Sequence, residues 1–374
     1  MQIYECLKKY IEFIGTDKFA KYQKDFASRI QHGLFDAYRE GYREPNIVSA
    51  IESVINQVNR LSSFDGKFRI STNSIFIHGT KSQVEFEYYG QKAQRELGDL
   101  IFIISIVYNN RKYFEKFTIT QFKKSTKEPK WYFNKKDRNG KYPDKEQLYL
   151  LSRLPTFKGI GKGSIIPMKE YNLPNYSGCL GSHSMLYTPG DFVFASSQKL
   201  EFLLGNNKSI DVKDTFSLYN FEEPRIFYAY PFLCYEDIEK LVYMWRELCR
   251  YYSKRPFPLY SSIMDWPIPI LNNSCYSHNI HVFTDKYLRT SIGELIFGYE
   301  IPYNQLALHF LQDFMTAIRR KAETEKNDRI LNFVAFFYRH AYGEGQGGEA
   351  YGESDYEGGG IGIIHTFINL GEGK

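Results

Sequence analysis

The sequence lacks any long uninterrupted hydrophobic run. No apolar segment in its 374 residues approaches the roughly 18–20 residues that a membrane-spanning helix needs. The first thirteen residues, MQIYECLKKYIEF, mix charged with apolar side chains and do not form the apolar centre of a signal peptide. We therefore expect a soluble protein that does not span a membrane and that acts in the cytoplasm.

Cysteine is scarce, and no two cysteines form a CxxC pair. The five residues are scattered along the chain at Cys6, Cys179, Cys234, Cys249 and Cys275. Their odd number and irregular spacing argue against a disulfide framework and against a zinc ribbon. Hydrophobic residues make up 43% of the chain and aromatic residues 17%, so we expect most of it to fold.

Positive charge is concentrated in one part of the chain. Residues 111–145 contain 12 Lys or Arg residues against 4 Asp or Glu, an excess of +8 in a chain whose net charge is +5. Aromatic residues lie among these lysines, a mixture that is typical of proteins that bind phosphate backbones and stack bases. A solvated basic loop is the alternative. The candidate nucleic-acid-binding residues are Lys124, Lys127, Lys130, Trp131, Lys135 and Lys136.

The hydrophobic periodicity changes along the first 155 residues. Apolar residues at three- and four-residue steps predict helices before residue 40 and over residues 46–61. Short segments rich in β-branched and aromatic residues then predict strands, and a further helix follows before Pro155. The predicted strands are residues 68–79, 83–89, 99–108 and 112–122, and the helix is residues 147–154.

The length favours two domains, and the mixture of elements predicts an α+β fold. We assign residues 1–155 to a first domain and residues 156–341 to a second α+β domain. The second domain should contain a hairpin around TPGD and helices near residues 305–322 and 329–340. Residues 342–374 form a glycine-rich acidic tail, in which IGIIHTFI could return as a strand.

The segment from Glu96 to Lys124 contains the most informative pattern. Asn109 and Asn110 separate two β-rich runs, and Asn tolerates the backbone conformation of a tight hairpin turn. Pairing the strands about this turn places residues opposite each other when their numbers sum to 219 or 220. Asp99 then lies opposite or beside Gln121, and Lys123 shares the face of Gln121 because strand side chains alternate.

These residue types suit the hydrolysis of a phosphodiester. The Asp99 carboxylate and the Gln121 amide oxygen are ligands that could hold Mg²⁺, which neutralises phosphate charge and lowers the pKa of a bound water. Lys123 could orient that water and stabilise negative charge that develops at phosphorus.

The segment resembles the PD-(D/E)xK superfamily of restriction-endonuclease-like nucleases. An acidic residue opens one strand in ELGD, and Gln121-Phe122-Lys123 resembles the QxK variant of the second motif. Two departures stand out: Gly98 replaces proline, and Gln121 replaces the usual acid, which should weaken metal binding. The resemblance covers residues 46–155 and implies a core of a helix, a β-meander, a helix and a further strand.

The resemblance also implies further site residues. A carboxylate is expected on the helix before the meander, for which Glu52 is the candidate and Glu96 the reserve. In helicase-associated members a glutamine follows the catalytic strand, and Gln147 in KEQLYLL is at a similar place. The implied function is Mg²⁺-dependent or Mn²⁺-dependent hydrolysis of DNA, by analogy in restriction or antiviral defence. Self-association or a defence-system partner protein is a further expectation.

Two other functions remain open at this point. The first is a non-catalytic nucleic-acid-binding or scaffold protein that keeps the fold with a degenerate site, which the missing acid at Gln121 would allow. The second is a metal hydrolase or sensor that uses Cys275, His278 and His281, whose CxxHxxH spacing supplies three metal ligands.

Overall fold

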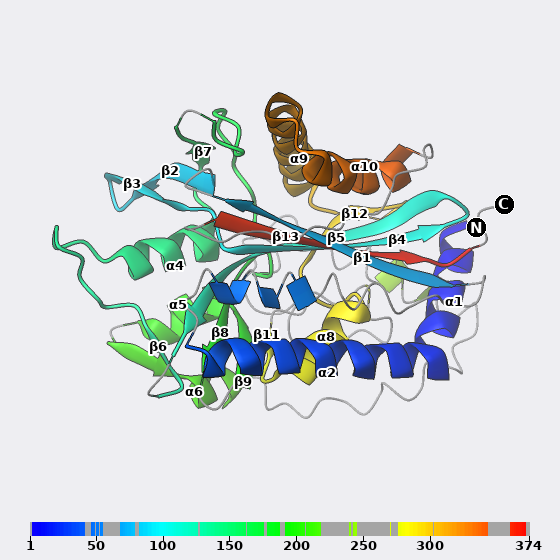
Figure 1. Cartoon of the computed structure of the whole chain (residues 1–374), viewed down its shortest axis with the longest axis horizontal. Helices are drawn as coiled ribbons and strands as arrows, with labels where there is room; N and C mark the ends of the chain where they lie inside the picture. The colour runs from blue at the N-terminus through cyan, green and yellow to red at the C-terminus, as the bar shows by residue number, and fades with distance from the viewer. Residues whose placement is uncertain are drawn as a thin grey trace.

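A mixed eight-stranded sheet forms the centre of the computed structural model, and helices cover each of its faces (Figure 1). The structure describes residues 2–41, 46–48, 50, 51, 53, 54, 68–78, 82–125, 128–161, 163–175, 178–187, 191–205, 207–217, 239, 240, 242–244, 270, 276–301, 303–342 and 360–371. Helices together with a mixed sheet confirm the predicted α+β fold class.

The strands occur along the whole described chain. They are β1 (Arg69–His78), β2 (Gln83–Tyr88), β3 (Gln91–Glu96), β4 (Leu100–Tyr108), β5 (Arg111–Lys124), β6 (Lys130–Tyr132), β7 (Phe157–Gly159), β8 (Gly181–Tyr187), β9 (Asp191–Ser196), β10 (Ser209–Asp211), β11 (Tyr276–Ser277), β12 (Glu294–Gly298) and β13 (Gly360–Asn369). The helices are α1 (Gln2–Ile14), α2 (Asp17–Arg39), α4 (Pro143–Arg153), α5 (Ser197–Leu204), α6 (Val212–Ser217), α8 (Ile280–Leu288), α9 (Gln305–Glu325) and α10 (Asp328–Tyr342).

The central sheet has the order β1-β13-β4-β5-β8-β9-β11, with β12 also paired to β5. β13 runs parallel to β4, and β8 runs parallel to β5, whereas β4 and β5 are antiparallel. The remaining strands form a β3-β2-β7 sheet and a β10-β6 pair. Within the central sheet β13 lies between β1 and β4, and β2 and β3 belong to a separate sheet, so the strands of the expected meander are not all neighbours.

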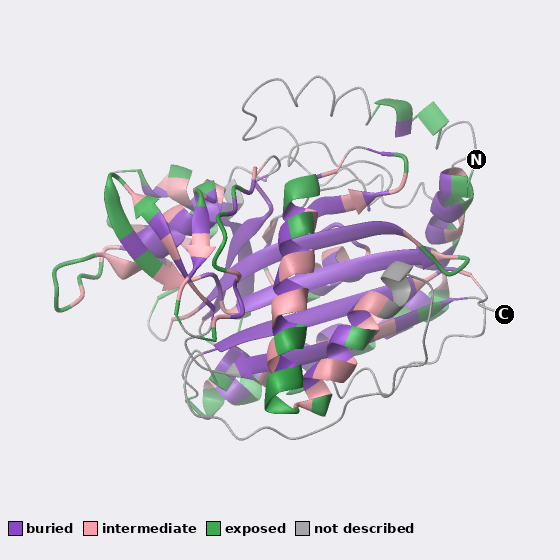
Figure 2. Ribbon diagram, turned by 90° about the horizontal axis from the view of Figure 1, so that it is seen from above, coloured by how far each residue is buried: buried purple, intermediate pink, exposed green. Residues whose placement is uncertain are grey.

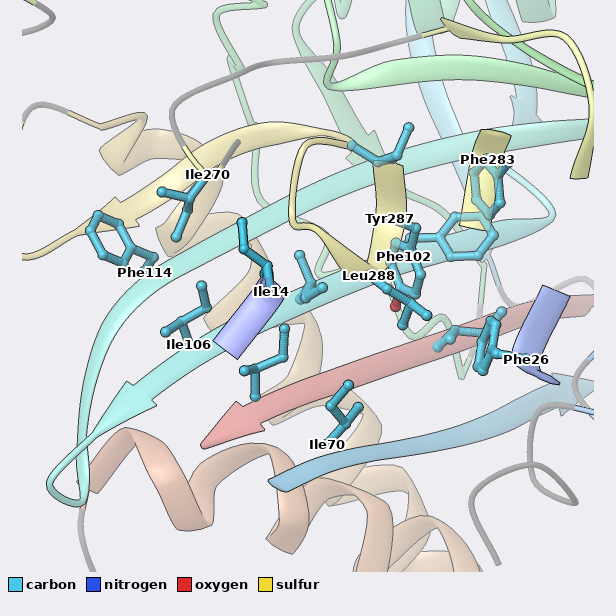
Figure 3. Close-up of a cluster of buried hydrophobic side chains, with 14 of the residues drawn as sticks. Ile14, Phe26, Ile70, Phe102, Ile106, Phe114, Ile270, Phe283, Tyr287 and Leu288 are labelled. Carbon is cyan, nitrogen blue, oxygen red and sulfur yellow. The ribbon is translucent and has the colours of Figure 1, made fainter. Parts of the chain in front are cut away.

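Alternation along β4 separates two hydrophobic cores. Leu100, Phe102 and Ile106 pack with residues of α1, α2 and α8, a cluster that includes Phe26, Phe283 and Tyr287 (Figure 3). Ile101 and Ile103 face the opposite side, where their cluster includes residues of α4, α9 and α10. Because both faces are covered, β4 and β5 are buried along most of their length, as the purple strands in Figure 2 show.

Several predicted elements are confirmed. The predicted strands correspond to β1, β2, β4 and β5, and the predicted helices at residues 147–154, 305–322 and 329–340 lie within or largely overlap α4, α9 and α10. The TPGD hairpin is formed by β8 and β9, which are antiparallel. Most of the predicted second helix, residues 46–61, lies outside the described residues, although Ile47, Val48 and Ile51 are buried.

The predicted boundary at residue 155 does not divide the sheet. β5 is fourteen residues long. It pairs with β4 along one edge, and with β12 and β8 along the other. All of its backbone groups need partners because the strand is buried, and residues beyond 155 supply them. One sheet therefore includes residues from both of the predicted domains.

The predicted tail also contributes to this sheet. β13 forms within it, at the predicted IGIIHTFI strand, and lies between β1 and β4. Its apolar side chains enter both cores, with Ile361 and Ile363 in one cluster and Ile364 and Ile368 in the other. A strand buried on both faces belongs to the core, so Gly360–Asn369 is not part of a tail.

Cysteine chemistry differs in one respect from the expectation. Cys179 is disulfide-bonded, whereas Cys6 is a buried free thiol. In the part of the chain that the structure describes, no helix combines the length and hydrophobicity that a membrane span requires.

Candidate active site

The β4–β5 hairpin brings the predicted catalytic residues together. Partner residues sum to 220 from Leu100 and Thr120 to Ile106 and Phe114, and to 219 from Val107 and Lys112 to the turn. A β-bulge next to the turn joins the two registers. Each of the two sums expected from the sequence therefore applies to one part of the hairpin. The even sum applies at the end of the hairpin, where Asp99 and Gln121 meet.

Asp99 is fixed by its backbone and by its side chain. Its N–H donates to the carbonyl of Thr120 at 3.0 Å, and its own carbonyl accepts from Gly362 at 2.8 Å. Carboxylate oxygen Oδ2 accepts hydrogen bonds from Gln121 Nε2 and from the N–H of Phe122, the latter at 2.7 Å. The carboxylate is thus held against the start of the hairpin, with little rotational freedom.

Gln121 presents its nitrogen, and not its oxygen, to Asp99. The side chain is 8% exposed, and Oε1 has no hydrogen-bond partner among the described residues. The predicted metal ligation needs the opposite orientation, because a cation binds the oxygen lone pairs of an amide. A half-turn of the amide group would direct Oε1 towards Asp99 and move the nitrogen to where the oxygen now lies.

Lys123 lies on the same side of the hairpin and pairs with a carboxylate from α4. Its Nζ is 2.8 Å from Oδ1 of Asp144, and the side chains of Lys123 and Asp144 are 24% and 23% exposed. Burial raises the pKa of Glu96, while the positive charge of Lys123 acts in the opposite direction. Within the described residues, no hydrogen bond or ion pair joins Glu96 to the other residues of this site, so Glu96 stays a predicted member.

Two contacts define how α4 crosses the sheet. Asp144, in its first turn, meets Lys123 near the end of β5, while a methyl group added at Gly181 would lie only 1.9 Å from the carbonyl oxygen of Leu151. The helix therefore runs opposite to β5 and β8. Gln147 precedes Leu151 by about one helical turn. The rise over these four residues is about 6 Å, which is close to the length of two residues in a strand. Gln147 consequently lies over the level of Gln121 and His183.

His183 is a site residue that the sequence did not indicate. It pairs with Gln121 in the parallel β5–β8 register and is fully buried. Nδ1 lies 2.8 Å from Oγ of Ser197, and Nε2 lacks a hydrogen-bond partner within the described part of the chain. Burial, followed by the charge of Lys123, lowers the pKa of His183 to about 3, so the imidazole is neutral at ordinary pH.

The layer between the strands and α4 thus contains an unusual set of polar atoms. Gln121 Oε1, Gln147 Nε2, His183 Nε2 and Trp131 Nε1 are all buried and lack hydrogen-bond partners among the residues described. An unsatisfied buried polar atom costs about 1–3 kcal/mol, so native proteins normally supply a partner, a water or an ion.

The residues fit a divalent cation in one limited way. Asp99 supplies a carboxylate and Gln121 an amide oxygen without a described partner, and Mg²⁺ commonly completes such a shell with water and phosphate oxygens. No group of three or more His, Cys, Asp and Glu side chains within the described ranges is arranged to hold a metal ion by itself. A cation here would therefore depend on substrate and water for most of its ligands.

Gly98 lies in a sterically restricted position at the start of the hairpin. A Cβ atom at this position would lie 2.7 Å from Cγ2 of Ile119 and 3.1 Å from the carbonyl oxygen of Thr120. A side chain at this position would therefore displace Ile119 or the backbone of Thr120, and glycine permits the close approach of β5.

The basic segment differs from the prediction at Trp131. Its ring is 1% exposed and packs against Phe133, with ring centroids 6.5 Å apart, in a core formed with α5, β9 and β10. Trp131 is therefore a core residue and cannot stack on a base, because neighbouring side chains cover the ring. The position of Trp131 among lysines in the sequence did not indicate that its ring is buried.

The predicted lysines are in varied surroundings. Lys135 and Lys136 are exposed, and Lys130 is half-buried with its Nζ 2.6 Å from Glu128. Lys124 lies on the opposite face from Lys123, with its Nζ 5.0 Å from the ring centroid of Tyr38 in α2. Lys127 lies outside the described residues.

Two further predictions fall wholly or partly outside the described residues. Glu52 is one of them. In the CxxHxxH segment Cys275 is also outside, while Nε2 of His281 lies 2.9 Å from Oε1 of Gln31 in α2. The described part of this segment therefore shows His281 in a contact between helices.

Comparison of the chain with protein-family models, curated protein sequences and solved structures finds no match. A functional assignment therefore depends on the geometry of this site.

Proposed function

We propose that the protein is a metal-dependent nuclease whose active site is the end of the β4–β5 hairpin. The observation that supports this most is the hydrogen bond between Gln121 and Asp99, together with the buried Oε1 of Gln121, which lacks a described partner. Lys123 follows Gln121 by two residues on the same face of β5. The exposed lysines of the basic segment, Lys135 and Lys136, offer contacts for a phosphate backbone. DNA is the expected substrate, and defence in the cytoplasm is the expected role, both by analogy with the superfamily.

Each residue has a distinct role in this proposal. Asp99 and the rotated amide of Gln121 would hold Mg²⁺ or Mn²⁺, with Glu96 or Glu52 as a further carboxylate. The cation, when bound, neutralises phosphate charge and supplies an acidic water. Lys123 orients the attacking water and stabilises negative charge on the phosphoryl oxygens. Asp144 holds the Lys123 ammonium group in place through their ion pair.

The test is cleavage of plasmid DNA, single-stranded DNA and RNA in the presence of Mg²⁺ or Mn²⁺. We expect Asp99→Ala to abolish cleavage and Lys123→Ala to slow it by about 10²–10³-fold. Lys124→Ala is the matched control, because Lys124 lies on the opposite face and contacts Tyr38. Asp99→Asn retains an acceptor for the Phe122 N–H and should therefore stay folded. Loss of cleavage in this variant would then be due to the missing charge and not to unfolding. Full activity in the Asp99 and Lys123 variants would exclude the proposal.

A second candidate is a non-catalytic nucleic-acid-binding protein with the same fold. The orientation of Gln121 favours it, since its nitrogen satisfies Asp99 without any cation. Such a protein would bind nucleic acid, would not cleave it, and would show no metal binding that depends on Asp99.

A further inference from the structure

One face of α4 presents alternating cations and aromatic rings. Lys145, Tyr149 and Arg153 follow one another at four-residue steps and therefore share one face of the helix. The guanidinium of Arg153 lies 5.3 Å from the ring centroid of Tyr149, and Nζ of Lys145 lies 5.2 Å from that of Tyr142. These distances are those of cation–π contacts.

The loop before α4 extends this pattern. Nζ of Lys136 lies 5.4 Å from the ring centroid of Tyr142, which places the loop lysine beside the beginning of the helix. From Tyr142 to Arg153 the helix is about 16 Å long. We call these five residues the aromatic–basic row: Lys136, Tyr142, Lys145, Tyr149 and Arg153. Figure 1 shows the loop leaving the body of the protein on the side where α4 lies.

The charges of the row are largely available to a ligand. Arg153 pairs with Glu201 through two contacts, at 2.9 and 3.1 Å, yet 55% of its side chain is exposed. Lys136 is exposed, and Lys145 is half-buried. Asp144 and Glu146 of α4 pair with Lys123 and Arg95, so Glu201 is the carboxylate that pairs with a cation of the row. The three cations therefore leave the row positive and complementary to an anionic polymer.

A tyrosine in an unfavourable backbone conformation lies beside the row. Tyr89 and Gly90 form the two-residue turn between β2 and β3, with φ values of 46° and 78°. Such turns ordinarily have Asn, Asp or Gly at the first position, and a bulky residue there is an outlier. Tyr89 is nevertheless 71% exposed, so burial does not compensate for the strained backbone.

The exposed ring of Tyr89 joins other aromatic rings. Its centroid is 4.8 Å from that of Tyr88 and 5.2 Å from that of Tyr149. The turn therefore places an additional ring next to the middle of the aromatic–basic row. Strain retained at an exposed aromatic residue is typical of a binding surface.

We propose that the aromatic–basic row, together with Tyr89, binds a single-stranded nucleic acid. Unpaired bases stack on Tyr142, Tyr149 and Tyr89, and Lys136, Lys145 and Arg153 contact phosphates. A duplex does not expose its base faces, so the rings discriminate against it. The inference deepens the proposed function and rests on it for the role of the bound strand, because the row begins beside Asp144, the partner of Lys123.

The test is fluorescence anisotropy with a labelled single-stranded DNA of about 20 nucleotides, a single-stranded RNA and a duplex of the same length. All titrations use Asp99→Asn protein, so that cleavage does not interfere. Tyr89→Asn should weaken single-strand affinity about five- to a hundredfold. Its Tm should be equal or higher, because Asn tolerates positive φ. A purely structural role for Tyr89 would instead lower Tm.

A second variant tests the cations of the row independently. Arg153→Gln should lower the slope of log affinity against log salt by about 0.7, the value for one phosphate contact in a single strand. Phe35→Ala is the control, since Phe35 is a 47% exposed aromatic residue of α2, outside both the row and the basic segment, and should leave affinity unchanged.

The outcomes separate this inference from the proposed function. Binding through the row without any cleavage by the unmodified protein would leave the inference standing and exclude the nuclease. Unchanged affinity in both Tyr89→Asn and Arg153→Gln would overturn the inference and indicate a protein partner for this surface, while Asp99-dependent cleavage would still stand. Equal affinity for single strands and duplex would also overturn it.

Discussion

The two ends of the β4–β5 hairpin have similar residues on the same face of the sheet but different surroundings. Near the turn, Ser105 lies opposite Glu115 in the register, as Asp99 lies opposite Gln121 at the other end. Oγ of Ser105 donates to Oε2 of Glu115 at 2.8 Å and lies 2.9 Å from Nε2 of His365. Lys112 completes this turn-side cluster, with its Nζ 2.5 Å from Oε2 of Glu115.

Access to solvent distinguishes the two ends. Ser105, Glu115 and His365 are completely buried, and the rings of Phe336 and Phe337 both lie with their centroids 5.4 Å from that of His365. At the Asp99 end the side chain of Lys123 is partly exposed. A carboxylate beside a lysine is therefore insufficient to indicate a catalytic site, because substrate must also reach it. We propose that the turn-side cluster serves stability and that the Asp99 end serves chemistry.

The largest effect should follow from breaking the turn-side cluster. Glu115→Ala leaves the largely buried Lys112 ammonium without its carboxylate, and loss of one partner from a buried pair costs about 3–5 kcal/mol. Urea denaturation should show a decrease of that size in the free energy of unfolding. Asp99→Asn should cost much less, because an acceptor for the Phe122 N–H is retained. Equal losses in the two variants would remove the distinction between the ends.

A smaller effect, confined to activity, is expected at Asp144. Asp144→Asn removes the charge that orients Lys123, and loss of such a supporting residue typically slows catalysis about 10–100-fold. Stability should change by less than about 1 kcal/mol because the ion pair is partly exposed. Cleavage rates and urea denaturation measured on one preparation test both parts. A large loss of stability with unchanged cleavage would reverse the roles assigned to the ends.

The smallest effect concerns acid stability. The pKa of His183 is about 3 in the folded protein because of burial, and near 6.5 when the chain is unfolded. The unfolded chain therefore binds the extra proton as pH falls below 6.5 towards 3, which destabilises the folded state by at most about 1.4 kcal/mol per pH unit. His183→Gln should show a shallower decline between about pH 7 and pH 5 in urea denaturation. Identical slopes would show that His183 does not remain neutral inside the fold.

Local patterns in the sequence were sufficient to predict the β4–β5 hairpin. Side-chain alternation and the Asn109-Asn110 turn predicted the pairing of Asp99 with Gln121, and the bulge explains why two registers were compatible with the pattern. The helical stripe through Phe19, Tyr22 and Phe26 is likewise buried in α2. These features depend on residues close together in the chain, where periodicity directly specifies geometry.

Features that depend on distant pairing could not be predicted in the same way. His183 lies beside Gln121 through a parallel register between β5 and β8, which no short turn fixes. The position of β13 between β1 and β4 joins the last strand to early ones, and the sequence indicated only that a strand could form. Trp131 was misassigned because α5 and β10, which cover its ring, are distant in sequence.

The most direct test of the central claim is a calorimetric titration with Mn²⁺ of the unmodified protein, Asp99→Ala and Gln121→Glu. If the Asp99 end holds a cation, the unmodified protein binds Mn²⁺ and Asp99→Ala does not. Gln121→Glu binds it about tenfold more tightly, because a carboxylate replaces a neutral ligand. Indistinguishable titrations of all three proteins would contradict the account, because neither side chain would then contact the metal.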